Sequence, residues 1–155
     1  MKTAKCSRDG FTLVEVLITA AVTSIVTVGL IQLFIYCSML SQLAGNLTNA
    51  TTDALTRLEE IRDHDYDLVT TDYASGGTPG NTFDPTQGTG KGIIYIDASN
   101  TDLLQIEIDI SFQNKNGRIV GEDTDIDGVL DAGEDTDGDG KLTSPVKLIS
   151  LVARR

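Results

Sequence analysis

Apolar residues are concentrated at the start of the chain, where residues 11–40 contain a single charged side chain, Glu15. An apolar run of this length spans a bilayer as a helix. Beyond it, apolar positions recur at three- and four-residue steps and form one stripe: Leu43, Leu47, Ala50, Ala54, Leu58 and Ile61. The pattern predicts one helix from about Thr12 to about Asp63, with its first half in a membrane and its second half packed on a head.

The pattern changes to a period of two in the second half of the chain. Residues 92–98 are short and β-rich, and in residues 104–113 apolar side chains alternate with polar ones. Asn116-Gly117 predicts a tight turn that returns residues 118–120 as a hairpin partner. Residues 146–153 are apolar enough for a last strand. We expect an α+β fold, in which the apolar face of an antiparallel sheet covers the long helix and the other face is in water.

These elements divide the chain into consecutive segments. We expect a leader at 1–10, a membrane and assembly helix at 11–40, and its amphipathic continuation at 41–64. Residues 65–91 are rich in Gly, Pro and Thr and predict a connecting loop. Residues 92–155 form the sheet, with an acidic insert at 122–146.

Charge and cysteine content restrict the classes of partner. The formal net charge of −11 argues against nucleic acid or an anionic membrane surface as a partner of the head. The two cysteines are Cys6, in the leader, and Cys37, late in the apolar stretch. Removal of the leader would leave one cysteine, so no intrachain disulfide could stabilise a small head.

The leader carries Lys2, Lys5 and Arg8 and ends at Gly10, directly before the apolar stretch. A secretory signal has its cleavage site after the apolar core, whereas cleavage after Gly10 would keep the core in the mature chain. The alternative is an uncleaved single-span anchor. Glu15 favours cleavage, because a carboxylate inside a bilayer costs at least ~2.5 kcal/mol unless it has a partner.

The junction of Gly10 with Phe11-Thr-Leu-Val-Glu15 resembles the processing motif of bacterial type IV pilins and type II secretion pseudopilins. The resemblance implies a pilin-like fold, cleavage after Gly10 by a membrane peptidase, and methylation of the new N-terminal Phe11. Glu15 would pair with the Phe11 ammonium of a neighbouring subunit during assembly. Many major pilins carry a Pro midway through the apolar segment; this chain has none there, which favours a minor subunit.

The acidic insert contains an internal repeat with a period of twelve residues. Residues 122–133 and 134–145 share seven of twelve aligned positions, which are Glu, three Asp, Thr, Gly and Leu. The first copy matches the calcium-loop template D-x-D-x-D-G with Glu at the twelfth position. A disordered acidic loop is the alternative, but so many carboxylates would repel one another without a counter-ion.

The template assigns ligands in both copies. In the first site the ligands are the Val129 carbonyl and five carboxylates between positions one and twelve: Asp123, Asp125, Asp127, Asp131 and Glu134. The eighth residue, Leu130, should point into the core. The second site takes Asp135, Asp137, Asp139 and the Lys141 carbonyl. Its twelfth position is Val146, so Thr143, water or a carboxylate from the first copy must complete the shell. We expect Ca²⁺ at the first site and a possible second ion.

No pattern in the chain indicates an enzyme. There is no nucleophile–base set and no zinc spacing, and the glycines at 88, 90 and 92 do not open a helix as a nucleotide loop would. His64 is the single histidine, and we interpret it as a solvated residue at the helix end, in preference to a metal ligand.

The combined expectation is a minor pilin or pseudopilin with a calcium-stabilised head. The resemblance implies other pilin subunits, a prepilin peptidase and an inner-membrane assembly platform as partners. The chain would cross the inner membrane once, with its head in the periplasm, and then enter a periplasmic or surface filament. A membrane-anchored, calcium-dependent adhesin that never polymerises is the alternative.

Overall fold

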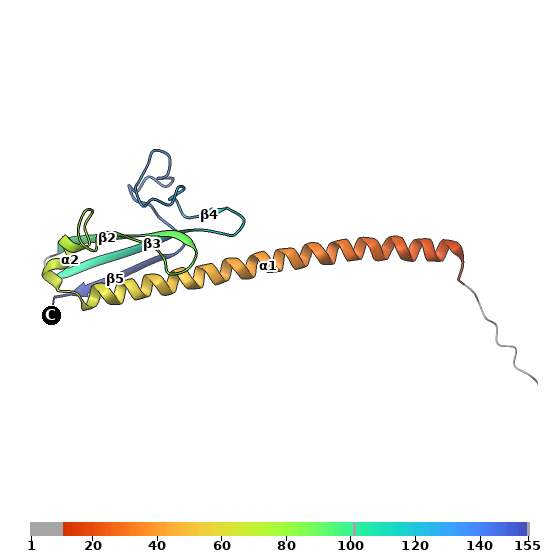
Figure 1. Cartoon of the computed structure of the whole chain (residues 1–155), viewed down its shortest axis with the longest axis horizontal. Helices are drawn as coiled ribbons and strands as arrows, with labels where there is room; N and C mark the ends of the chain where they lie inside the picture. Colours follow the sequence, from red (N-terminus) through yellow and green to blue (C-terminus); the bar gives the residue numbers. More distant parts are fainter. Residues whose placement is uncertain (1–10, 101, 155) are drawn as a thin grey trace, which may run out of the picture. The chain divides into compact units, whose positions relative to one another are not determined.

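The computed structural model describes residues 11–100 and 102–154 and shows one long helix followed by a small sheet (Figure 1). Helix α1 runs over Leu13–Asp63, which confirms the predicted helix with a start one residue later. The chain divides into two units, Met1–Ser41 and Gln42–Arg155. The second unit, called the head below, contains the rest of α1 and the whole sheet.

The sheet of the head has five antiparallel strands, and β3 is at its centre. On one side β3 (Leu103–Gln113) pairs with β2 (Thr89–Asn100), which in turn pairs with β1 (Thr82–Phe83). On the other side it pairs with β5 (Lys147–Ala153) and, at its end, with β4 (Ile119–Val120). The predicted hairpin and last strand are confirmed.

The core of the head lies between α1 and one face of this sheet. Ala50, Ala54, Leu58 and Ile61 face the sheet from the helix and are buried, as the three- and four-residue spacing predicts. The sheet contributes the buried apolar positions of β3: Leu104, Ile106, Ile108, Ile110 and Phe112. The α+β architecture expected from the two periodicities is therefore observed.

The connection after α1 is more ordered than the predicted loop at 65–91. It contains a second helix, α2 (Tyr66–Asp72), as well as β1 and the start of β2. The Asp65 side chain accepts a hydrogen bond from the Asp67 N–H and so caps α2, and Val69 is buried in the core. The content of Gly and Pro predicted a loop, but the Asp65 cap and one buried apolar residue suffice for a short helix.

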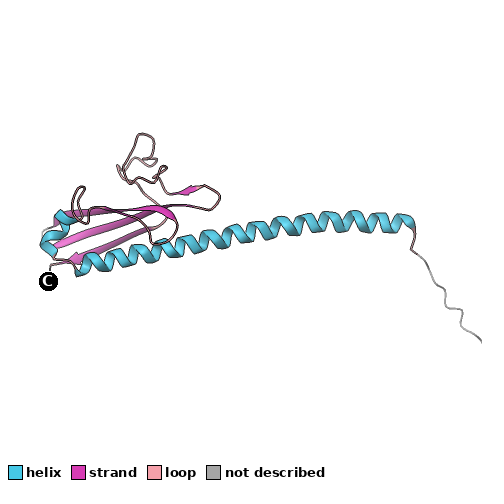
Figure 2. Cartoon of the chain, in the orientation of Figure 1, coloured by secondary structure: helices cyan, strands magenta, loops and turns pink. Residues whose placement is uncertain are grey.

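The acidic insert between β4 and β5 contains no helix or strand, and it forms the longest loop region in Figure 2. It begins at Gly121, whose φ of 122° lies in the region that favours glycine. A Cβ atom at this position would lie 2.1 Å from the Ser111 hydroxyl oxygen, so only glycine allows the insert to start so close to β3.

Candidate functional site

The first turn of α1 holds Glu15, the residue expected to act in assembly, against Thr12. Thr12 accepts hydrogen bonds from the Glu15 N–H with its hydroxyl oxygen at 3.3 Å and its carbonyl oxygen at 3.1 Å. Thr12-x-x-Glu15 has the spacing of a capping box, a signal that the sequence interpretation did not use. Phe11 precedes the helix and is exposed, and Gly10 lies outside the described residues.

The first half of α1 exposes every side chain from residue 11 to residue 41. This segment is the one stretch in the described residues that is long and apolar enough to cross a membrane. Its hydroxyl groups donate to carbonyl oxygens one turn back: Thr23 to Thr19 at 2.7 Å, Thr27 to Thr23 at 2.7 Å and Ser24 to Ala20 at 2.8 Å. Because these donors are satisfied within the helix, the segment suits a hydrocarbon environment.

The acidic insert folds onto the outer face of the sheet, opposite α1. The Tyr95 hydroxyl accepts a hydrogen bond from the Leu142 N–H at 2.8 Å, and Lys141 Nζ lies 2.5 Å from Glu107 Oε2. As a result Glu107, Asp109 and Ser111 are buried, although the sequence predicted that this face of β3 is in water. The prediction was wrong because the alternation of a strand defines two faces but does not show what covers the second face.

Two buried carboxylates lie under the insert. Burial would raise the pKa of Glu107, but the ammonium groups of Lys141 and Lys147 outweigh burial and hold that pKa below its ordinary value. Burial raises the pKa of Asp109 to about 7. Asp109 Oδ1 accepts the Ser144 N–H at 3.2 Å, whereas Oδ2 has no hydrogen-bond partner among the described residues. Asp109 is therefore a buried carboxylate that contacts the end of the insert through one of its two oxygens.

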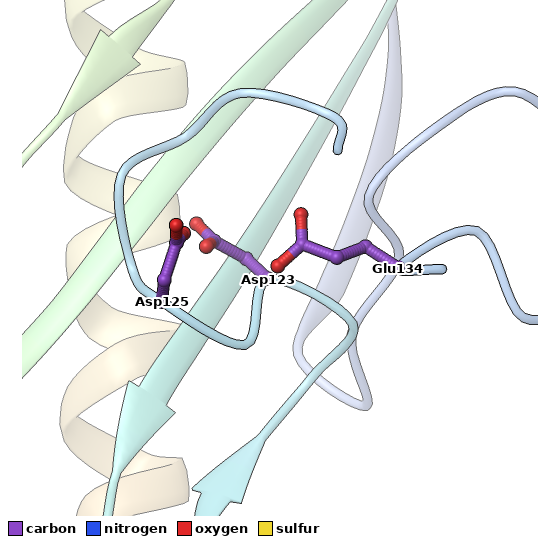
Figure 3. Close-up of side chains that lie close together, drawn as sticks. All are labelled: Asp123, Asp125 and Glu134. Atoms are coloured by element: carbon purple, nitrogen blue, oxygen red, sulfur yellow. The ribbon is translucent and has the colours of Figure 1, made fainter. Parts of the chain in front are cut away.

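The first acidic loop holds Asp123, Asp125 and Glu134 together, and their three carboxylates face one another (Figure 3). One oxygen from each lies within 4.8 Å of the others. Asp123 is fully buried and accepts the backbone N–H groups of Ile126 at 2.7 Å, Asp127 at 3.2 Å and Gly128 at 3.0 Å. Burial raises the pKa of Asp123 despite these donors, so its negative charge lacks a full counter-charge.

Glu134 closes the first loop from its twelfth position. Its Oε1 accepts both the N–H and the hydroxyl of Thr124 at 2.7 Å, and its Oε2 accepts the Asp131 N–H at 3.2 Å. The Thr124 hydroxyl, with the Thr124 N–H, lowers the pKa of Glu134. The glutamate therefore joins the second and ninth positions of the loop.

The other expected ligands of the first loop lie close by. Oxygens of Asp125, Asp127 and Asp131 form a second group within 4.8 Å, and all three residues are exposed. Asp127 Oδ1 accepts the Val129 N–H at 2.7 Å. The side chains that the template assigned are thus brought together in two overlapping groups that share Asp125.

The second acidic loop repeats this arrangement with Asp135, Asp137 and Asp139, whose oxygens also lie within 4.8 Å of one another. Asp135 accepts the N–H groups of Gly138 at 2.6 Å and Gly140 at 3.1 Å. Asp139 Oδ1 accepts the Lys141 N–H at 2.8 Å, so the chain bends at the residue expected to offer its carbonyl.

Glu122 closes the second loop, a role that the sequence interpretation left open between Thr143, water and a carboxylate from the first copy. Its Oε1 accepts the N–H of Thr136 at 3.0 Å and its hydroxyl, and its Oε2 accepts the N–H and hydroxyl of Thr143 at 2.9 and 2.7 Å. The hydroxyls of Thr136 and Thr143 lower the pKa of Glu122 to about 2. The sequence signal that could have predicted this role of Glu122 is its alignment with Glu134 in the repeat.

The two leucines at the eighth positions differ in burial. Leu142 is 1% exposed, whereas Leu130 is 40% exposed, so the expectation that Leu130 points into the core was wrong. The second loop lies against Tyr95 and β3, and its Leu142 is buried at this contact. The exposed Leu130 shows that the same loop sequence buries its leucine only where a surface is present to receive it.

Chemically, both loops offer only oxygen atoms. Carboxylates and carbonyls suit a hard divalent cation such as Ca²⁺, which takes six to eight oxygens. The backbone N–H groups that surround the carboxylates supply partial positive charge, but no Lys or Arg forms an ion pair with the seven clustered aspartates or with Glu122 and Glu134 in the described part of the chain. The arrangement is consistent with a cation-binding insert.

His64 lies near the start of α2 and is not the solvated residue that we expected. Its Nε2 lies 2.8 Å from Asp72 Oδ2, and its ring meets the Tyr73 ring edge-on with centroids 5.4 Å apart. The side chain is partly buried. It joins the two ends of α2 and lies in none of the acidic groups described above.

Comparison with known proteins adds one match. Residues 5–31 match the family described as the prokaryotic N-terminal methylation motif. The match covers the end of the leader, the Gly10–Phe11 junction, Glu15 and most of the apolar segment. Neither a curated protein nor a solved structure matches the chain.

Proposed function

The chain carries the signature of type IV prepilins and pseudopilins, which prepilin peptidase processes, and on this premise we propose that it is a minor filament subunit with a calcium-stabilised head. The observation that carries the proposal is the methylation motif at residues 5–31, followed by a helix whose apolar surface is exposed. The filament is a type IV pilus or a type II secretion pseudopilus.

The proposed maturation starts with cleavage between Gly10 and Phe11. Methylation of the new N-terminus of Phe11 follows, and the apolar half of α1 then transfers from the inner membrane into the filament. Glu15 lies one helical turn after Phe11, in the first turn of α1. In a staggered stack of helices its carboxylate pairs with the Phe11 ammonium of a neighbour, and low polarity strengthens that pair.

The proposed partners follow from this maturation. They are other pilin or pseudopilin subunits, the prepilin peptidase, and the assembly platform of the inner membrane. The head would lie in the periplasm before assembly. The apolar segment lacks a Pro, which supports a minor subunit.

The proposed calcium sites use the two acidic loops. The first takes carboxylates, with the Val129 carbonyl, from these residues: Asp123, Asp125, Asp127, Asp131 and Glu134. The second takes the Lys141 carbonyl and four carboxylates: Asp135, Asp137, Asp139 and Glu122. The proximity of the aspartate oxygens within each loop supports the assignment, as does the burial of Asp123 and Glu134. For Glu122 the support is its hydrogen bonds to Thr136 and Thr143 at the two ends of the second loop.

Calcium would act here as a substitute for a disulfide. The insert joins β4 to β5, and β5 forms seven register pairs with β3. Ordering the insert therefore holds the last strand on the sheet. A ligand present at a hundred times its Kd adds about 2.7 kcal/mol to the stability of the folded state.

Chelation tests the calcium proposal. In full-length chain in detergent micelles, we expect EGTA to lower the melting temperature of the head, measured by calorimetry, and excess Ca²⁺ to restore it. The Glu122→Gln/Glu134→Gln chain should melt at the same temperature with and without EGTA. An unchanged melt of the parent chain on chelation would contradict the proposal.

Filament assembly tests the subunit proposal against a solitary calcium-dependent adhesin. We expect Glu15→Ala to be cleaved normally but to be depleted at least tenfold from the sheared filament fraction of its host. Gln32→Ala, which replaces an uncharged polar residue on the same exposed helix, should assemble as the parent does. Normal surface activity of Glu15→Ala without filaments would favour the adhesin.

A further inference from the structure

Two basic side chains of the head differ from the others because they have no carboxylate partner among the described residues. Within residues 42–100 and 102–154, six of the Lys and Arg side chains form ion pairs: Arg57, Arg62, Lys91, Lys141, Lys147 and Arg154. The other two, Lys115 and Arg118, form no ion pair with any described residue, and both are exposed. On a strongly acidic protein, these two cations are available to meet an external negative charge.

Lys115 and Arg118 lie on the turn between β3 and β4, called the basic turn below. The turn is held by hydrogen bonds from the Asn114 N–H to the Arg118 carbonyl at 2.8 Å and from the Gly117 N–H to the Asn114 carbonyl at 2.9 Å. The Asn46 amide of α1 donates to the Asn114 side chain at 2.8 Å. These bonds hold the backbone that carries the two cations, which reduces the entropy that binding would cost.

A surface with the opposite charge lies at an open cavity of about 650 Å³, where α1 ends, α2 begins and β5 ends. Two of its acidic residues are neutralised, because Glu59 pairs with Arg62 and Asp67 pairs with Arg154. The remaining two, Asp63 and Asp65, are exposed and form no ion pair in the described structure. The cavity therefore retains an excess of negative charge.

The location of Asp63 makes this negative charge unfavourable in the isolated head. Asp63 is the last residue of α1, where the carbonyl groups of the helix already create a negative potential. A cation at the cavity would relieve this repulsion. Apolar groups of Leu151, Val152 and Ala153 line the same cavity and could cover the aliphatic stem of a Lys or Arg.

The basic turn and the cavity lie at opposite ends of the central strand. Leu103, the first residue of β3, is opposite Ala153 of the cavity, and Gln113, its last residue, is opposite Ile119 beside the turn. Ten residue steps of an antiparallel strand cover roughly 34 Å. The two surfaces are therefore separate patches, and a contact between them joins one copy to the next head-to-tail.

We propose that the basic turn of one copy docks in the Asp63–Asp65 cavity of a second copy. This inference rests on the proposed function, since the contact lies in the filament, and it requires two copies of the minor subunit to be neighbours there. Charge complementarity favours a second copy over an anionic lipid surface, because the acidic insert would be repelled by such a surface.

Charge reversal in the full-length chain, produced in its host, tests the contact. We expect Lys115→Glu/Arg118→Glu to lower the amount of chain in sheared filaments at least fivefold. Asp63→Lys/Asp65→Asn should do the same, and Asn keeps the cap of α2. The chain with all four substitutions should return to within twofold of the parent level. Asp84→Asn, which neutralises an exposed acid away from the cavity, should assemble as the parent does.

Crosslinking identifies the neighbour directly. In the Cys37→Ser background, a Lys115→Cys chain and an Asp63→Cys chain with a different tag are produced together, and filaments are treated with a short bismaleimide. We expect a heterodimer carrying both tags. The pair of Lys115→Cys with Asp84→Cys should give none.

The outcomes separate this inference from the proposed function. If the parent chain is found in filaments but gives no crosslink, and charge reversal has no effect, the contact is overturned and the filament role stays intact. If the substitutions in the turn remove the chain from filaments and the chain with all four substitutions is not restored, the turn meets another acidic surface. This result would also overturn the proposed contact. Absence of the parent chain from filaments would overturn both.

Discussion

Glu122 Oε2 accepts hydrogen bonds from both the N–H and the hydroxyl of Thr143, which lies 21 residues further along the chain. In the same way Glu134 Oε2 accepts the N–H of Asp131. Thr143 and Asp131 are the ninth residues of their loops, so each glutamate closes one loop. The Glu122 contact also spans the whole insert and brings its first residues next to those that lead into β5.

The two glutamates should therefore control separate calcium sites. We expect Glu122→Gln to abolish or weaken the second site and Glu134→Gln the first, each by at least tenfold in Kd, or about 1.4 kcal/mol. The number of ions bound per chain, measured by titration calorimetry of the full-length chain in detergent, should fall from two to one in each variant. Glu60→Gln, at an exposed glutamate on α1, serves as the control. Two ions bound by Glu122→Gln with parental affinity would contradict the assignment of Glu122.

The two leucines of the repeat offer a matched pair of core substitutions. Leu142→Ala removes a side chain that is 1% exposed and should lower the free energy of unfolding by about 2–5 kcal/mol. Leu130→Ala removes one that is 40% exposed and should change it by less than about 1 kcal/mol. Chemical denaturation of both variants measures the difference. Equal losses would mean that both loops are buried to the same extent.

Asp109 predicts a loss of stability as the pH rises. Its pKa of about 7 in the folded state exceeds the ordinary value of 3.8, so the folded state binds more protons between these pH values. Stability should therefore fall from about pH 4 to pH 7 and then level off. The difference between these two pKa values corresponds to about 4 kcal/mol, and because solvent screens part of the charge we expect about half of it.

Asp109→Asn should remove this pH dependence, since the amide oxygen still accepts the Ser144 N–H. We expect the variant to be more stable than the parent by about 2 kcal/mol at pH 8 and similar to it at pH 4. Denaturation in EGTA isolates the effect from metal binding. A parental slope of stability against pH in the variant would assign the pH dependence to another group.

Gly92 and Gly45 predict opposite effects of the same substitution. A Cβ atom at Gly92 would lie 2.2 Å from the Phe83 ring, which also has the Arg57 guanidinium 4.7 Å from its centroid. Gly92→Ala should therefore displace Phe83 and cost about 1–3 kcal/mol. Gly45 lies within α1 with open space around it, so Gly45→Ala should stabilise the helix by up to about 1 kcal/mol. Thermal melts of the two variants test the prediction.

The sequence by itself determined the features that depend on neighbouring residues. The stripe that includes Ala50, Ala54 and Leu58 defines the helix and its buried face, and the alternation from Leu104 to Phe112 defines the central strand. These patterns follow from 3.6 and 2 residues per repeat, which any chain must obey. The acidic template placed the loop carboxylates for the same reason, because its ligands lie within twelve residues.

Only the tertiary structure decided which surfaces are covered and which distant residues meet. Periodicity assigned Glu107 and Asp109 to the second face of the sheet, but the folded insert buries them. The Glu122–Thr143 contact and the separation of the basic turn from the Asp63 cavity likewise depend on how strands pair across the chain. Such contacts join residues far apart in sequence, so no local pattern encodes them; they follow from the packing of the whole head.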